Sequence, residues 1–152
     1  MKELIIMAGL PGAGKSYIRN KYYNKFNVVD CDEIKKKLPN YDPEQPRALH
    51  QESKIVEEYE IDHNLKEGNS FVYDTTATNI DKIVKLIQHA QELQYRVTIV
   101  YVKVSLATAM MRNSKRDRVV PVDVILDKYS KLNESINMFN IYANQLITID
   151  NE

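Results

Sequence analysis

Short apolar runs and longer helical patterns alternate along this chain. Five runs rich in β-branched side chains predict strands at residues 4–8, 27–29, 70–73, 96–104 and 145–149. Between these runs, apolar residues recur three or four positions apart, which is typical of amphipathic helices. Clear examples are Ile80, Ile83, Val84, Ile87 and Ala90, and then Ile125, Tyr129, Leu132, Ile136 and Phe139.

Residues at the ends of the predicted helices agree with this division. Asn79 can cap a helix that begins at Ile80, and Pro121 suits the first turn of the last long helix. Strands that alternate with helices of this length predict right-handed crossovers and a mainly parallel sheet. Ligands of such sheets bind beyond the carboxyl ends of the strands. We therefore expect the chemistry just after residues 8, 29, 73 and 104.

Two further patterns are interpreted as structural. The acid-rich stretch 52–62 predicts an amphipathic helix whose apolar residues are Ile55, Val56, Tyr59 and Leu65. The histidines show neither the spacing of metal ligands nor that of a catalytic triad. They are His50, His63 and His89.

A phosphate-binding motif follows the first predicted strand directly. Residues 9–16 read GLPGAGKS and match G-x-x-x-x-G-K-[ST] in the strand–loop–helix setting that this motif requires. Glycine lets the backbone N–H groups surround phosphate oxygens closely. Lys15 is expected to contact the β- and γ-phosphates of ATP, and the Ser16 hydroxyl to bind Mg²⁺. The predicted ATP-binding residues are Gly9, Leu10, Pro11, Gly12, Ala13, Gly14, Lys15, Ser16, Tyr17 and Arg112.

The motif and the strand pattern together predict the fold class. We expect a three-layer α/β/α P-loop NTPase with a five-stranded, mainly parallel sheet, similar to nucleoside monophosphate kinases with a short lid. The chain has 152 residues, the length of one domain. A single P-loop kinase domain is therefore predicted over residues 1–152.

Charge and composition narrow the partners. The 21 basic and 21 acidic residues give no net charge, so a polyanion would have to be held by a local patch. The one cysteine, Cys31, excludes an intramolecular disulfide. No apolar stretch approaches the length of a membrane span, and the first residues lack the apolar run of a signal peptide. A cytoplasmic protein without a membrane partner is predicted.

Carboxylates follow the second and third predicted strands. Asp32 is a candidate general base that would accept the proton of an attacking hydroxyl, although it could instead cap a helix starting near Glu33. Asp74 is predicted to support Mg²⁺ together with Ser16. The hydroxyls of Thr75 and Thr76 could bind the acceptor or a phosphate, or could simply form a turn.

A basic segment follows the fourth predicted strand. Residues 112–118 contain four cations and one acid, and Arg112 and Arg116 would share a face if this segment were helical. Arginine can neutralise the charge that develops on a transferring phosphoryl group. A solvated basic surface is the alternative, but the position after a strand favours a lid over residues 112–120. Arg116 is the predicted catalytic residue of this lid.

Two segments, MRNSKR at 111–116 and VPVDV at 120–124, strengthen the prediction. With the phosphate loop, Asp32 and Asp74, they resemble the kinase domain of bacteriophage T4-type polynucleotide 5′-hydroxyl kinase. The resemblance spans nearly the whole chain and implies transfer from ATP to the 5′ end of single-stranded DNA or RNA. It implies that Lys15 and Ser16 bind ATP and Mg²⁺, that Asp32 activates the hydroxyl, and that Arg116 contacts the transferring phosphate.

Two departures from that family leave the acceptor open. Lys35 stands where the family has an acceptor-binding arginine, which keeps the charge but loses the bidentate fork. The phosphatase domain fused to the phage enzyme is absent from these residues, so healing of RNA ends would need a separate phosphatase. Residues 32–36 and 38–42 resemble instead the zeta-toxin-type kinases, which phosphorylate sugar nucleotides. A third possibility is an ATP-binding regulatory module without an acceptor.

The alternatives predict different surfaces. A polynucleotide kinase needs a basic groove near residues 35–37 and binds single strands in a salt-sensitive manner. A sugar-nucleotide kinase needs a closed pocket, and its binding depends little on salt.

Overall fold

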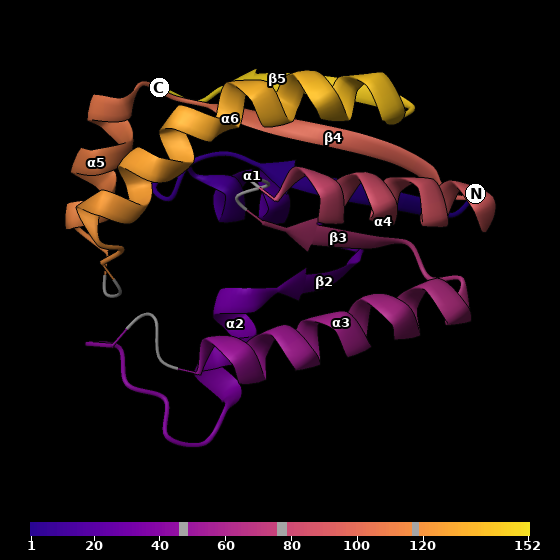
Figure 1. Cartoon of the computed structure of the whole chain (residues 1–152), viewed down its shortest axis with the longest axis horizontal. Coiled ribbons are helices and arrows are strands. Elements are labelled where there is room, and N and C mark those ends of the chain that lie inside the picture. The colour runs from indigo at the N-terminus through magenta and orange to yellow at the C-terminus, as the bar shows by residue number, and fades with distance from the viewer. Residues whose placement is uncertain (46–48, 76–78, 117–118) are drawn as a thin grey trace.

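Five parallel strands form the centre of the molecule. The computed structural model describes residues 1–45, 49–75, 79–116 and 119–152. The strands run in the order β2-β3-β1-β4-β5, and all four pairings are parallel (Figure 1). Their bounds are β1 Glu3–Ala8, β2 Asn27–Asp30, β3 Phe71–Asp74, β4 Arg96–Lys103 and β5 Gln145–Asp150. The predicted five-stranded α/β sheet is thereby confirmed.

Helices follow the strands along the described part of the chain. They are α1 Lys15–Tyr22, α2 Cys31–Lys37, α3 His50–Glu67, α4 Ile80–Glu92, α5 Leu106–Ser114 and α6 Val122–Tyr142. The side chain of Asn79 accepts a hydrogen bond from the Lys82 N–H at 3.3 Å, so the predicted cap of α4 is confirmed. Pro121 is the N-cap of α6 and lies just before its first turn. No described helix combines the length and the apolar character needed to cross a membrane.

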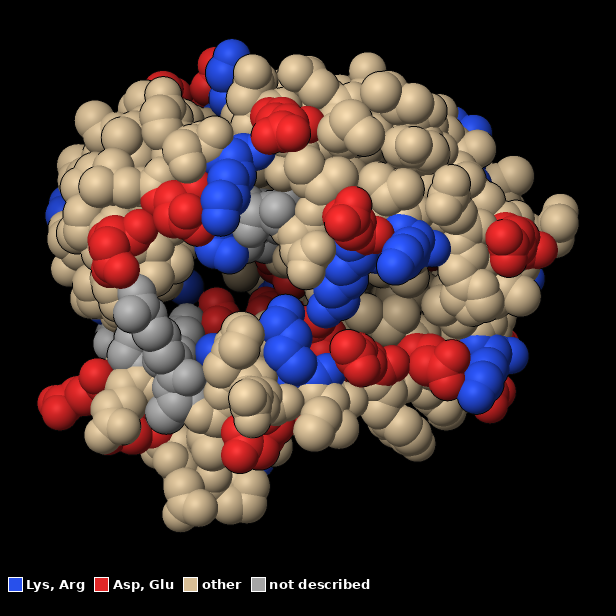
Figure 2. All heavy atoms as spheres, in the orientation of Figure 1, with Lys and Arg blue, Asp and Glu red and all other residues tan. Residues whose placement is uncertain are grey.

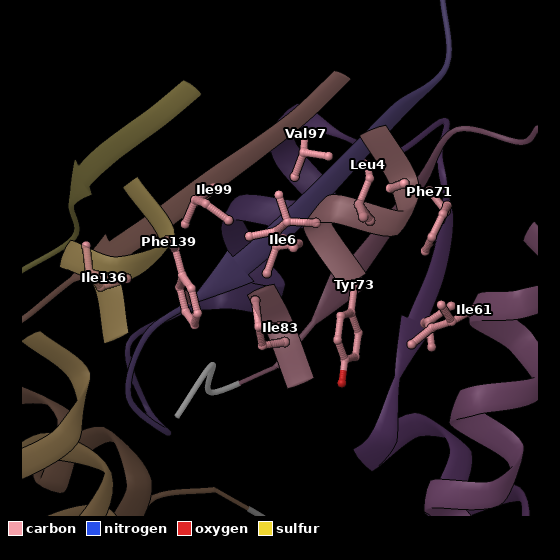
Figure 3. Packing of buried hydrophobic residues seen from close by; sticks show 14 of the residues in the cluster. Leu4, Ile6, Ile61, Phe71, Tyr73, Ile83, Val97, Ile99, Ile136 and Phe139 are labelled. Atoms are coloured by element: carbon pink, nitrogen blue, oxygen red, sulfur yellow. The ribbon is translucent and has the colours of Figure 1, made fainter. Parts of the chain in front are cut away.

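The two faces of β1 pack against different helices, which gives three layers. The larger apolar cluster contains Leu4 and Ile6 of β1 together with residues of α3, α4 and α6, among them Ile61, Ile83 and Phe139 (Figure 3). On the opposite face, Ile5 and Met7 pack with Ile18 of α1. Side chains alternate across a strand, so one short apolar run serves both layers.

The buried face of α3 differs from the predicted one. Ile55 and Tyr59 are each 70% exposed, although Leu65 of the same series lies in the core. Polar partners decide which face is buried. Glu57 accepts a hydrogen bond from the Tyr73 hydroxyl at 2.7 Å, and the side chain of Asn64 accepts one from Asn27 at 3.0 Å. The buried residues of the helix are Ser53, Glu57, Ile61, Asn64 and Leu65.

Candidate active site

A cavity of about 720 Å³ lies beyond the carboxyl ends of β1, β2 and β3, at the predicted edge of the sheet. Figure 2 shows its opening on the left of the view, with acidic side chains deep inside and basic ones at the rim. The phosphate loop forms one wall, α2 and α3 form a second, and the segment from α5 to α6 forms a third. The loop contributes Leu10, Pro11, Gly12, Gly14, Lys15 and Ser16 to the lining.

Lys15 is held at the base of the cavity. Its Nζ donates hydrogen bonds to the carbonyl oxygens of Gly9 and Thr75, each at 3.2 Å, and lies 3.6 Å from Asp74 Oδ1. The ammonium group therefore sits between the phosphate loop and the end of β3. The neighbouring Tyr17, predicted to bind ATP, lies outside the cavity, is 61% exposed and has its ring beside Lys21.

The phosphate loop packs tightly against α5. Gly12 has a φ of 88°, and a Cβ there would come within 2.4 Å of the Ala109 carbonyl oxygen. The buried Ala13 lies behind the cavity wall, and its carbonyl oxygen accepts hydrogen bonds from Asn151 Nδ2 at 2.9 Å and Arg112 Nη1 at 3.3 Å. Arg112 thus reaches the loop, and its side chain also lines the cavity. Its contact with ATP stays a prediction.

Asp74 lies deeper than the sequence indicates, and it has a partner that no motif revealed. The carboxylate is only 7% exposed. Its Oδ2 accepts a hydrogen bond from Arg19 Nη1 at 2.7 Å, and the same nitrogen donates to Asp30 Oδ2 at 2.8 Å. Burial raises the pKa of Asp74, and the nearby charge of Asp30 adds to this, whereas Lys15 and Arg19 act in the opposite direction. One sequence signal could have indicated this partner, because Arg19 follows Lys15 by one helical turn.

Asp32 lines the cavity in the first turn of α2. The alternative that it caps this helix is wrong, because α2 begins earlier, at Cys31. Asp30 is the N-cap, and its Oδ1 accepts the N–H of Asp32 at 2.9 Å. Asp32 is also close enough to Asp74 to raise the pKa of that carboxyl group. The candidate base and the carboxylate of the nucleotide site therefore belong to one cluster.

A set of lysines gathers on the walls away from the phosphate loop. Lys35, predicted to bind the acceptor, is 6% exposed and lines the cavity, as does Lys54 of α3. Lys128 of α6 joins them, and burial lowers its pKa, with Lys15 and Lys54 lowering it further. His50, interpreted as structural, also lines this wall. The sequence predicted Lys35 but missed His50, Lys54 and Lys128, because these come from two other helices, α3 and α6.

Glu57 holds part of this wall in place. It is 1% exposed, and its Oε1 accepts hydrogen bonds from Tyr73, from Lys82 at 2.9 Å and from Lys54 at 3.3 Å. Burial opposes ionisation, but Lys82 and Tyr73, followed by Lys54, outweigh it and lower the pKa of Glu57. The residue is therefore an ionised anchor for Lys54.

The predicted lid lies at the mouth of the cavity. Arg116 is exposed and lines the cavity, but α5 ends at Ser114, so Arg112 and Arg116 do not share a helical face. A clamp made by Asn113 fixes the segment. Its Nδ2 donates to the Val120 carbonyl at 2.8 Å, and its Oδ1 accepts the Val120 N–H at 2.9 Å. Residues 117–118 of the lid lie outside the described part of the chain.

The two predicted threonines fare differently. Thr75 lines the cavity, and its backbone N–H donates to the Met7 carbonyl at 3.3 Å, which joins it to the end of β1. Thr76 lies outside the described residues.

The donor set suits Mg²⁺. Within the described residues, no group of three or more His, Cys, Asp or Glu side chains could hold a metal by itself. Mg²⁺ in kinases is bound through one or two protein oxygens, with phosphates and water completing the shell. The Ser16 hydroxyl and Asp74 carboxylate, which both line the cavity, supply oxygens of this kind.

A parallel sheet in this order, with a glycine-rich phosphate loop after β1, defines a protein of the P-loop kinase type. The Zeta toxin family matches residues 1–151, and the chain belongs to that family. Its membership supports ATP binding and phosphotransfer.

Solved structures show the same fold. The AvrRxo1-ORF1:AvrRxo1-ORF2 structure with sulphate ions is 18% identical, with a TM-score of 0.77 over 97% of this chain and 55% of that one. The structure of the PezAT chromosomal toxin–antitoxin system of Streptococcus pneumoniae is 16% identical, with a TM-score of 0.70 over 99% and 68% of the two chains.

A third structure concerns RNA repair. The Pnkp1/Rnl/Hen1 RNA repair complex contains a chain that is 15% identical, with a TM-score of 0.68 over 90% of this chain and 45% of that one. At these identities the likeness shows the fold alone. This chain also spans only about half the length of the first of these proteins.

Proposed function

We propose that this protein transfers the γ-phosphate of ATP to a hydroxyl group of a small anionic acceptor, such as a sugar nucleotide. The observation that carries the proposal is that one cavity is lined by the phosphate loop, by Asp32 and by lysines on the facing walls. A cavity of about 720 Å³ also falls within the range typical of small-molecule sites.

The residues take the following roles in transfer. The acceptor oxygen attacks the γ-phosphorus while the bond to the bridging oxygen breaks and ADP leaves, and the acceptor proton passes to Asp32. Lys15 contacts the β- and γ-phosphates. Arg112 and Arg116 neutralise charge on the transferring group. Ser16 and Asp74 would hold Mg²⁺, which would supply further neutralisation of the phosphate charge.

The charge of the lining favours an anionic acceptor. The described residues around the cavity include six cations and four acids. Two of the acids, Asp30 and Asp74, are paired with Arg19, and Glu57 is paired with lysines. On the acceptor side, Lys35 and Lys54 both line the cavity, and Glu57 holds Lys54 there. The positive charge of this wall favours a phosphate-bearing molecule.

The 5′-hydroxyl end of a polynucleotide is the second candidate. Asp32 and Arg116, to which that resemblance assigns roles, both line the cavity. So does Lys35, which stands in place of the family's acceptor-binding arginine. However, Lys36 and Lys37 are exposed and do not line it, and Lys36 pairs with Glu33 at 3.3 Å. A groove that binds a single nucleic acid strand would use these side chains, so the small acceptor ranks first. A regulatory module without an acceptor has no use for Asp32 in this place.

The test is transfer of labelled γ-phosphate from ATP with Mg²⁺ to UDP-N-acetylglucosamine and, in parallel, to single-stranded DNA and RNA with 5′-hydroxyl ends. Label on the sugar nucleotide supports the proposal, and label on the oligonucleotide makes the second candidate correct. Lys15→Met should abolish transfer to either acceptor, and it controls for contaminating kinases. ATP binding without transfer to any hydroxyl compound would refute both candidates and favour the regulatory module.

A further inference from the structure

Arg19 is a buried charge in α1 that the motifs do not explain. Its side chain lies one helical turn after Lys15 and points away from solvent, with 8% of the residue exposed. Burial opposes the charge, but the pKa of the guanidinium group is raised because Asp30 and Asp74 outweigh that effect. Burying a cation costs desolvation free energy, so a buried arginine next to the phosphate loop needs compensating contacts.

One nitrogen of Arg19 joins two carboxylates from neighbouring strands. Nη1 lies 2.7 Å from Asp74 Oδ2 and 2.8 Å from Asp30 Oδ2. With Oδ2 occupied, Asp74 presents its other oxygen, Oδ1, toward Lys15 at 3.6 Å. The Arg19 contact therefore sets the rotation of the carboxylate that faces the phosphate loop.

The second carboxylate extends the connection to the candidate base. Asp30 uses Oδ2 for Arg19 and Oδ1 for the backbone N–H of Asp32, at 2.9 Å. That hydrogen bond is the N-cap of α2, which fixes where the helix begins. A continuous series of contacts thus runs from α1, through Asp30, to the helical turn that carries Asp32.

We propose that Arg19 is a positioning residue that aligns Asp74 and Asp32 with the phosphate loop for the transfer step. This inference rests on the proposed function, because it concerns the same transfer step. It assigns Arg19 no contact with ATP or with the acceptor, so Arg19 acts only through Asp74 and Asp32. A purely structural ion pair would stabilise the fold without affecting turnover selectively. The two cases differ in what happens to kcat when ATP binding is intact.

The experiment compares Arg19→Met, Arg19→Lys and Asp30→Asn in the full chain. We measure ATP affinity by titration, kcat and KM for transfer, and the melting temperature. Arg19→Met should lower kcat at least tenfold with a change of less than threefold in ATP affinity. Arg19→Lys should stay within threefold of the wild-type kcat, since a single nitrogen makes both contacts. Lys21→Met, on the exposed side of the same helix, is the matched control.

A double-mutant cycle tests the link to α2. If Arg19 acts through Asp30, the variant carrying both Arg19→Met and Asp30→Asn should be no slower than Arg19→Met alone. Should Arg19→Met fail to fold, Asp30→Asn and Arg19→Lys decide the matter. An unchanged kcat in Asp30→Asn, or a loss of ATP affinity as large as the loss of kcat, would overturn the positioning role.

The failure of the proposed function can be told apart from the failure of this inference. If the wild-type protein phosphorylates no acceptor, the kinase proposal fails. Slow hydrolysis of MgATP to ADP and phosphate then still reports on Asp74 and Asp32, because water replaces the acceptor. A tenfold loss of that hydrolysis in Arg19→Met with intact ATP binding would support the positioning role, and an unchanged rate would refute it.

Discussion

Replacing Asn113 by alanine tests whether the lid must be fixed for transfer. Asn113 is 3% exposed, and its side chain makes two hydrogen bonds to the backbone of Val120. These bonds join the two ends of the segment that contains Arg116. Arg116 itself lies in neither α5 nor α6. Alanine removes both bonds, and the Val120 N–H and C=O must then form hydrogen bonds with water.

The two bonds set the size of the effect. A hydrogen bond of this kind contributes about 0.5–1.5 kcal/mol net, so the pair contributes about 1–3 kcal/mol. If that free energy holds the lid in place, its loss reduces the population of the closed lid about 5- to 150-fold, at roughly 1.4 kcal/mol per factor of ten. If Arg116 acts on the transferring phosphate as proposed, the value of kcat should fall by a similar factor, because Arg116 would be held in place less often.

The assay is transfer of labelled phosphate under saturating ATP, together with thermal melting. Asn113→Asp should fall between the wild-type protein and Asn113→Ala, because its carboxylate can still accept the Val120 N–H. Ser114→Ala is the matched control, since its exposed hydroxyl donates to the Met111 carbonyl one turn earlier, at 2.6 Å. Wild-type turnover in Asn113→Ala would show that the clamp does not position Arg116, whatever the change in melting temperature.

Further predictions concern the base, the loop and the buried acid. Asp32→Asn should slow transfer about 10²- to 10⁴-fold with unchanged ATP affinity, measured by rapid quench, because an amide cannot take the proton. Gly12→Ala should lower the free energy of unfolding by about 1–2 kcal/mol because of its φ of 88°. The 2.4 Å contact with α5 should lower it further. In urea unfolding, Gly68→Ala should show only the first of these effects, because its nearest contact is 3.5 Å. The lowered pKa of Glu57 means that its stabilisation is present above pH 4.5 and is lost as the pH falls through the folded-state pKa. Glu57→Gln should therefore lower the melting temperature at pH 7 and lower it less at pH 3, whereas the exposed Glu58→Gln should change neither.

The sheet and the phosphate loop could be predicted because their signals are local. Each strand is a short apolar run, and the central strands β1, β3 and β4 are buried on both faces. The glycine pattern of the loop is dictated by backbone geometry. The cap at Asn79 was equally readable, since one side chain satisfies one helix end. For these features, a few neighbouring residues contain all the information.

The side chains that organise the site could not be predicted in this way. Arg19 and Glu57 are charged residues on helices, and such residues usually face solvent. They are buried here because their partners come from other elements, Asp74 for one and Lys82 for the other. The sequence pattern indicated only Asp32 as a cap of α2, whereas Asp30 is the cap and contacts Arg19 of another helix.

The contact between Asn151 and Ala13 bears on how the protein is made. The loop is synthesised early, but the side chain that accompanies its Ala13 carbonyl comes 138 residues later. Asn151 follows β5, which pairs with β4, and its own N–H donates to the Lys103 carbonyl at 2.9 Å. A nascent chain in which only the phosphate loop has been synthesised therefore lacks the Asn151 hydrogen bond to that loop. We therefore expect ATP to stabilise most strongly those chains in which the last strand has joined the sheet.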